Sequence, residues 1–221
     1  MLLEEKINNL KKEIINYANL VETMIEKSIR GLMKKDKVLL NEVIEKDEHQ
    51  ANTLEIELDE VCTNLIAQYQ PAAKDLRTIL MALMINNDLE RLGDHAVNIA
   101  KSSLYLIERL QVKPLIDIPN MAEEAIAMLK DSINSFIHED AKLAKKVCER
   151  DNTVDALRDQ ILRELITYMT SDPTTIERSL HLIRISSNLE RIADLSTNIC
   201  EDVIFMVEGR IIKHHKEETQ S

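Results

Sequence analysis

The chain carries the stretch Asn86-Asn87-Asp88-Leu89-Glu90-Arg91-Leu92-Gly93-Asp94, and a close copy follows as Ser186-Ser187-Asn188-Leu189-Glu190-Arg191-Ile192-Ala193-Asp194. Four residues after the final Asp of each copy comes an Asn-Ile pair, Asn98-Ile99 and Asn198-Ile199. A motif that recurs at equivalent positions indicates that one architecture is used twice. The sequence therefore predicts two similar halves, each with this motif near its end.

The composition is typical of long helices. Of the 221 residues only 3 are Gly and 4 are Pro, and there is no Trp. Leu, Ile, Glu, Lys, Ala and Met dominate, as they do in helical proteins. The fold class that we predict is all-α, with two tandem antiparallel three-helix bundles made of six long helices.

Apolar residues recur at helical spacing in three stretches of each half. The predicted helices cover residues 3–34, 36–69, 72–110, 120–137, 140–170 and 174–212, with Asp36 as the N-cap of the second. Short turns between them should make consecutive helices antiparallel. We assign residues 1–111 to a first repeat, 112–119 to a linker that contains Pro114 and Pro119, 120–213 to a second repeat, and 214–221 to a flexible tail.

Charge and cysteine usage limit the class of protein. The formal net charge of −11 argues against nucleic acid as a partner, because phosphate binding needs clustered Lys and Arg. Cys62, Cys148 and Cys200 form no C-x-x-C pair, which indicates reduced cysteines in a cytoplasmic protein. The start lacks a signal-peptide pattern, and the apolar run 79–85 is far shorter than the roughly 20 residues that span a bilayer. Any membrane role should therefore pass through a partner.

Both motifs place carboxylates on one helix face. Glu90 and Asp94, like Glu190 and Asp194, are four residues apart, where like charges repel by roughly 0.2–0.5 kcal/mol per exposed pair. A bound cation is the simplest way to offset that repulsion in both copies. Hard cations need several oxygen ligands, so a second helix should contribute. That helix carries Glu48, Asn52, Glu55 and Asp59 in the first half, and Asp151, Asp155 and Asp159 in the second.

Matching Ala51-Asn52-x-Leu54 with Val154-Asp155-x-Leu157 aligns these second helices. The expected cofactors are divalent or trivalent metal ions, such as iron, zinc, manganese or magnesium, in an open and partly hydrated site. The predicted ligands are Glu90, Asp94, Asn98, Glu48 and Asn52 in the first half, and Glu190, Asp194, Asn198, Asp151 and Asp155 in the second.

Three other interpretations stay open. The carboxylates can be merely solvated, with Arg91 and Arg191 paired to Asp94 and Asp194. A carboxylate-bridged metalloenzyme, an oxidase or hydrolase, is disfavoured, because a di-iron site needs Glu-x-x-His and no phosphate loop or G-x-S-x-G elbow is present. We therefore predict no catalytic residues and no enzyme. The third interpretation is a purely structural helical scaffold.

A set of apolar residues lies off the predicted core stripes. Its members are Leu76, Leu80, Leu83, Ile176, Leu180 and Ile183. They either pack the two halves together or form a partner surface, and the sequence does not choose between these roles.

The repeated L-E-R-[IL]-[GA]-D motif, in a twice-used three-helix unit, resembles the PhoU family. Further similarities are Gln70-Pro71-x-x-x-Asp75-Leu76-Arg77 before the first motif and Ser171-Asp172-Pro173 in the second half. The resemblance covers nearly the whole chain. It implies two three-helix bundles related by a pseudo-twofold axis, with metal ions, iron clusters in some members, on the acidic motifs. Because Asn52 stands where the second half has Asp155, unequal occupancy of the two sites is expected.

The resemblance also implies a regulatory function. Such proteins repress phosphate-starvation signalling and restrain phosphate uptake from the cytoplasm. The implied partners are the ATPase subunit of a phosphate ABC transporter and a sensor histidine kinase, so the membrane is reached only through the transporter. We also expect a homodimer, and the identity of the metal stays open.

Overall fold

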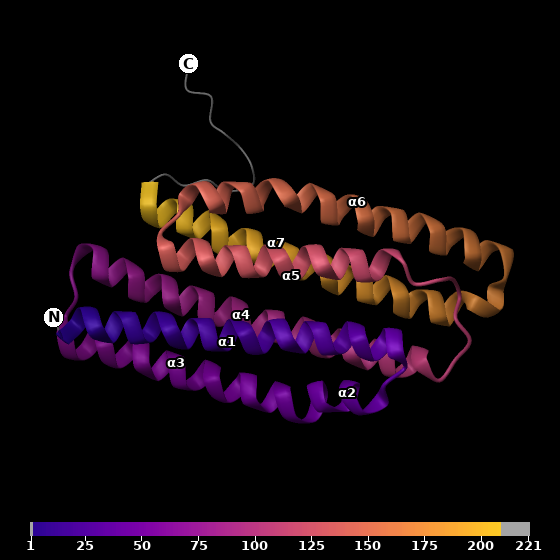
Figure 1. The fold of residues 1–221 in the computed structure, drawn as a ribbon, viewed down its shortest axis with the longest axis horizontal. Helices are drawn as coiled ribbons and strands as arrows, with labels where there is room; N and C mark the ends of the chain where they lie inside the picture. The colour runs from indigo at the N-terminus through magenta and orange to yellow at the C-terminus, as the bar shows by residue number, and fades with distance from the viewer. Residues whose placement is uncertain (1, 209–221) are drawn as a thin grey trace, which may run out of the picture.

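Every element of this computed structural model, which describes residues 2–208, is a helix (Figure 1). The elements are α1 Leu2–Lys34, α2 Lys37–Glu42, the π-helical η1 Val43–Asp47, α3 Glu48–Tyr69, α4 Ala73–Ile107, α5 Asp117–His138, α6 Ala141–Ser171, the 3-10 helix η2 Pro173–Thr175 and α7 Ile176–Glu208. The predicted end of the last helix at residue 212 and the predicted tail, 214–221, lie outside the described residues. None of the described helices is long and apolar enough to cross a membrane.

The helices form two bundles that lie side by side along the long axis of the molecule (Figure 1). Helices α1, α3 and α4 pack together in the first, and α5, α6 and α7 in the second. The bundles meet through α4 against α7 and α1 against α5. The predicted fold class, two tandem three-helix bundles of long helices, is therefore confirmed. Cys62, Cys148 and Cys200 are buried within it and free.

The same turn joins the first two helices of each repeat. Asp36 caps the second helix of the first repeat by accepting the backbone N–H groups of Val38 and Leu39, at 3.0 and 3.2 Å. Asp140 caps α6 in the same way, at 2.9 and 3.0 Å. The residue before each Asp, Lys35 or Glu139, is left-handed, with φ of 54° and 53°. This is the common ending of a helix followed by a capped one, and it aligns the repeats residue by residue.

A π-helical segment interrupts the helix that the sequence predicts over 36–69. The chain from Asp36 to Asn52 is one residue longer than the equivalent chain from Asp140 to Asp155. A π-turn absorbs one extra residue without ending a helix, and η1 lies within this stretch. As a result, the acidic residues of α3 occupy the same helical positions as their counterparts in α6.

The connection between the repeats lies three residues earlier in the chain than predicted, and Lys113 anchors it. Helix α4 ends at Ile107, and α5 begins at Asp117 rather than at residue 120. Pro119 falls in the first turn of α5, where a missing N–H costs no helical hydrogen bond. Lys113 in this connection is buried, and its amine donates to Asp117 at 2.8 Å and to Glu164 of α6.

Polar and aromatic contacts cross the seam between α4 and α7. His95 Nδ1 lies 2.8 Å from Asn188 Oδ1, and the Tyr105 and His181 rings stack with centroids 3.9 Å apart. Among the off-stripe apolar residues, Leu83 and Ile183 are partly buried against the core. Leu80 and its counterpart Leu180 are 45% and 44% exposed, so they belong to the outer surface.

Candidate metal centres

The three helices of the first repeat place its acidic motif beside α3. The Asn86 side-chain amide donates to the backbone oxygen of Glu55 at 2.9 Å. Further along α4, a Cβ built at Gly93 would lie 3.9 Å from Cβ of Ala51 and 3.8 Å from Cε of Met24 in α1. Helix α3 therefore runs antiparallel to α4, and this register places the predicted ligands Glu48 and Asn52 close to the level of Asp94.

Glu90 and Asp94 form an acidic cluster with Glu55, a residue of α3 that we did not predict as a ligand. Burial raises the pKa of the half-buried Glu90, and the charges of Asp94 and Glu55 raise it further. Among the described residues no Lys or Arg forms an ion pair with these three carboxylates. Arg91 instead lies 3.4 Å from Asp88, so the pairing of Arg91 with Asp94 is not found.

Two buried polar atoms lie at the inner side of this cluster. Tyr17 of α1 is fully buried, its hydroxyl has no hydrogen-bond partner, and Oδ1 of the buried Asn86 also lacks one. Burial raises the pKa of Tyr17, and the charges of Glu90, Glu55 and Asp94 add to the rise. Helices α1 and α4 run parallel, as the bond from Ser28 Oγ to the Ala96 oxygen and the Met24–Gly93 proximity show. That register puts Tyr17 level with Asn86.

The second repeat places its motif carboxylates among arginines. Arg158 of α6 reaches Glu190 at 3.5 Å and Asp159 at 2.9 Å, and Arg191 reaches Asp194 at 3.1 Å. Burial and Asp194 raise the pKa of Glu190, whereas Arg191 and Arg158 oppose that rise. The predicted i+3 ion pair of a solvated acidic face is therefore found in this repeat.

The remaining predicted ligands lie on the same helices. Asn98 and Asn198 are exposed one turn beyond the motifs, and Asp151 and Asp155 are half-buried on α6. The Asp155 charge acts on both Glu190 and Arg158. As the side chains stand in residues 2–208, no three His, Cys, Asp or Glu side chains are close enough together to hold a metal ion. Carboxylates with no counter-ion between them repel one another. Their side chains would therefore have to rotate towards a cation to bind it.

Sequence reasoning missed Tyr17, Asn86 and Arg158. Tyr17 falls in the apolar stripe of the first helix, where the spacing alone predicts a core residue. The signal for Arg158 was present, because the alignment of Asn52 with Asp155 also aligns Glu55 with Arg158.

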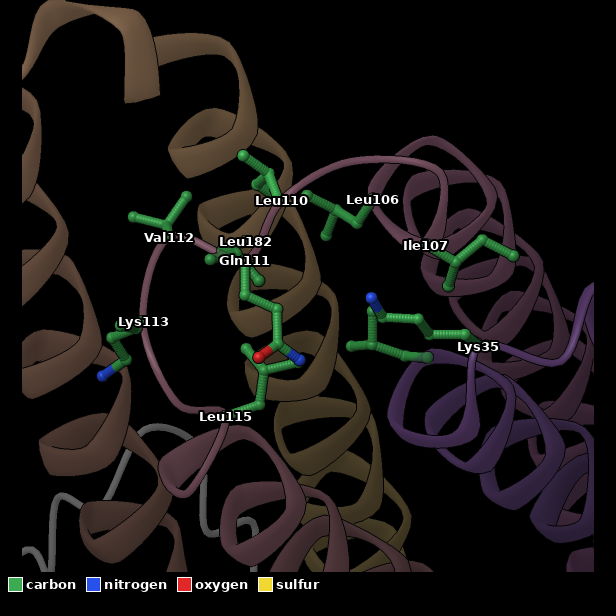
Figure 2. A pocket seen from close by; sticks show the side chains of 10 residues that line it. Lys35, Leu106, Ile107, Leu110, Gln111, Val112, Lys113, Leu115 and Leu182 are labelled. Atoms are coloured by element: carbon green, nitrogen blue, oxygen red, sulfur yellow. The ribbon is translucent and has the colours of Figure 1, made fainter.

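A small, partly open pocket lies where the connection between the repeats passes the end of α1, and Leu182, one turn before the second motif, lines it (Figure 2). Figure 2 shows Lys35, the residue after α1, on one side of it and Val112 on the other, with the amine of Lys113 directed away. Its volume is about 20 Å³, which holds about one water molecule. This pocket therefore offers no site for a larger ligand.

The fold and the two acidic motifs define a class of tandem-repeat helical-bundle protein with a carboxylate pair on the last helix of each repeat. The model of the PhoU domain family matches residues 14–103 and 118–203, which is one match in each bundle. The chain belongs to the PhoU family.

Relatives match the chain over almost its full length. The Aquifex aeolicus phosphate-specific transport system accessory protein PhoU homolog is 42% identical, covering 97% of this chain and 96% of that protein. A second PhoU homolog, from Thermotoga maritima, is 34% identical over 98% and 92%. The crystal structure of PhoU from Pseudomonas aeruginosa superposes with a TM-score of 0.89 at 33% identity, covering 94% of this chain and 99% of that one. The prediction that the chain is not an enzyme is confirmed by the family to which it belongs.

Proposed function

We propose that the chain is a cytoplasmic regulator of phosphate uptake and phosphate-starvation signalling. The observation that carries the proposal is the full-length similarity to proteins named as accessory proteins of a phosphate-specific transport system. A solved relative from Streptococcus pneumoniae, 26% identical with a TM-score of 0.88, is named as a phosphate transport system regulatory protein. An accessory protein without catalytic residues acts by binding. The partners that we propose are the ATPase subunit of the phosphate transporter and a sensor histidine kinase, with the chain itself acting as a homodimer.

The surface of the chain supports a role in docking. Its net charge of −11 favours a basic partner surface, and complementary charge speeds association. Next to the acidic residues of α3 and α4 lie apolar side chains that are open to solvent, Ile56 at 57%, Leu80 at 45% and Met84 at 49%. An apolar centre within a charged rim is the usual composition of a protein interface.

We propose further that hard metal ions take part in this docking. The residues that would hold them in the first repeat are Glu90, Asp94 and Glu55, with Glu48 and Asn52 nearby on α3. What a bound hard cation supplies is positive charge and open coordination positions for oxygen ligands. Because the protein ligands lie at the bundle surface, the carboxylates of a partner can reach the open coordination positions of the ion.

A pull-down tests the proposed docking. The wild-type chain should retain the transporter ATPase and the kinase, whereas Glu90→Ala/Asp94→Ala should retain less of both and should release the starvation response in phosphate-rich cells. Asp75→Ala, an exposed change on the same helix, is the matched control. Unchanged capture and intact repression in the double variant would refute a role for the motif. Failure of the wild-type chain to capture either partner would refute the docking function.

A further inference from the structure

The second bundle holds two of the three cysteines, on neighbouring helices. Cys148 belongs to α6 and Cys200 to α7, and both are buried and free. The exposed fraction of Cys148 is 8%, whereas Cys200 is fully buried. Neither thiol lies in an acidic motif or takes part in the proposed docking, so the pair has no role in the function described above.

The register of α6 against α7 places the two cysteines level with each other. The helices pack side by side and run antiparallel (Figure 1), and Arg158 of α6 lies 3.5 Å from Glu190 of α7. Cys148 comes ten residues before Arg158, and Cys200 comes ten residues after Glu190. Because both helices rise by about 1.5 Å per residue, equal steps in opposite directions bring the two cysteines to the same level.

The two thiols also contact each other. Hydrogen bonding with the Cys200 thiol lowers the pKa of Cys148, while burial opposes that change. The same contact, together with burial, raises the pKa of Cys200. Beyond this level the helices stay together, since Lys145 of α6 lies 2.7 Å from Glu208 of α7. A disulfide needs two thiols that face each other on adjacent segments, and α6 and α7 supply them.

The first bundle has a cysteine but not a pair. The repeated motif aligns Cys200 with Ala100, so the equivalent bond is impossible there. Cys62 of α3 is fully buried, and burial and the charge of Asp59, rather than a second thiol, raise its pKa to about 12. Cys62 is therefore an internal control for the chemistry of an isolated buried thiol in the same chain.

An oxidant of the peroxide class converts such a pair into a disulfide in two balanced steps. The sulfur of Cys148, the more exposed thiol, attacks one oxygen of hydrogen peroxide; an S–O bond forms, the O–O bond breaks and water leaves. The sulfur of Cys200 then attacks the sulfenic sulfur; the S–S bond forms, the S–O bond breaks and a second water leaves. The two thiols lose two electrons and two hydrogen atoms, and the peroxide is reduced to two waters.

We propose that Cys148 and Cys200 form a reversible, peroxide-sensitive disulfide that ties α6 to α7 in the second bundle. Disulfides of cytoplasmic proteins are usually transient and redox-sensing, which agrees with cysteines that are reduced at rest. The bond closes a loop through the turn at Asp172 and so restricts the unfolded chain, which stabilises the folded one. The inference is independent of the docking function.

Thiol counting on the full chain tests the proposal. The folded protein is treated with hydrogen peroxide, unfolded with a thiol-labelling reagent and weighed by mass spectrometry. Labelled thiols should fall from three to one, and dithiothreitol should restore all three. Trypsin should release residues 147–150, which contain Cys148, linked to residues 192–210, which contain Cys200. Three labelled thiols after treatment, a bond that involves Cys62, or sulfinic acid on Cys148 without the linked peptide would overturn the proposal.

Two alanine variants and urea unfolding complete the test. Cys62→Ala should still give the linked peptides, whereas Cys200→Ala should not, and circular dichroism checks that both variants are folded. The peroxide-treated wild type should unfold at a higher urea concentration before dithiothreitol than after it. This comparison isolates the disulfide, because dithiothreitol leaves oxidised methionines unchanged. Equal unfolding midpoints before and after reduction would contradict a bond that ties the two helices.

Discussion

Leu40→Ala should lower the free energy of unfolding by about 2–5 kcal/mol, and Gly31→Ala by about 1–3 kcal/mol. Leu40 is fully buried, so its truncation leaves a cavity. A Cβ at Gly31 would lie 2.5 Å from Leu40 Cδ2, which forces the side chain to move. The two changes together should cost clearly less than their sum, because the added methyl enters the space that Leu40 leaves.

The second repeat already contains this exchange. The turn at Asp36 and Asp140 aligns Gly31 with Ser135 and Leu40 with Ala144, so the second repeat has a larger residue at the first position and a smaller one at the second. Equilibrium unfolding in urea of the wild type, both single variants and the double variant gives the coupling energy. Additive losses would show that the repeats do not share this packing, and Leu58→Ala paired with Gly31→Ala is the uncoupled control.

Asp88→Asn should raise the free energy of unfolding by up to about 3 kcal/mol above about pH 6. Burial raises the pKa of Asp88 from 3.8 to about 6; Arg91 partly opposes this rise and Asp202 adds to it. The ionised carboxyl is thus disfavoured in the folded chain. Stability from this group is full below the unfolded pKa near 4 and is lost as the pH rises through about 6. Asn188 stands at the equivalent position in the second repeat.

Urea unfolding of chelator-treated protein between about pH 4 and 8 measures this effect. The gain of Asp88→Asn should vanish towards the acid end, because the wild-type carboxyl is then protonated in both states. Asp75→Asn, on the exposed face of the same helix, should change stability little at any pH. A gain for Asp88→Asn that is independent of pH would show that packing, and not ionisation, is responsible.

The sequence predicted the helices well where a local signal marks them. Asp36 and the Asp172-Pro173 pair are such signals, and the structure has helix starts at both. The π-segment Val43–Asp47 was missed because one inserted residue leaves no gap in an apolar pattern. Pro119 predicts a linker because proline usually breaks a helix, but the first turn of a helix accepts proline and α5 includes it.

The candidate sites were only half predictable. The repeated motif identifies the carboxylates in the sequence. Their i, i+4 spacing places them on one helix face without a structure. What distinguishes the two sites is the group that each neighbouring helix brings to them. Tyr17 and Arg158 reach the motifs through packing of helices far apart in the sequence, so only the assembled bundle shows their effect.

The affinity of the purified chain for the transporter ATPase, measured with Mn²⁺ and then with a chelator, tests most directly the claim of metal-dependent docking. The affinity should fall by about tenfold or more, roughly 1.4 kcal/mol, when the metal is removed. Glu90→Gln/Asp94→Asn with Mn²⁺ should then bind as weakly as the chelated wild type. Equal affinity for wild type and variant, with and without metal, would contradict the account.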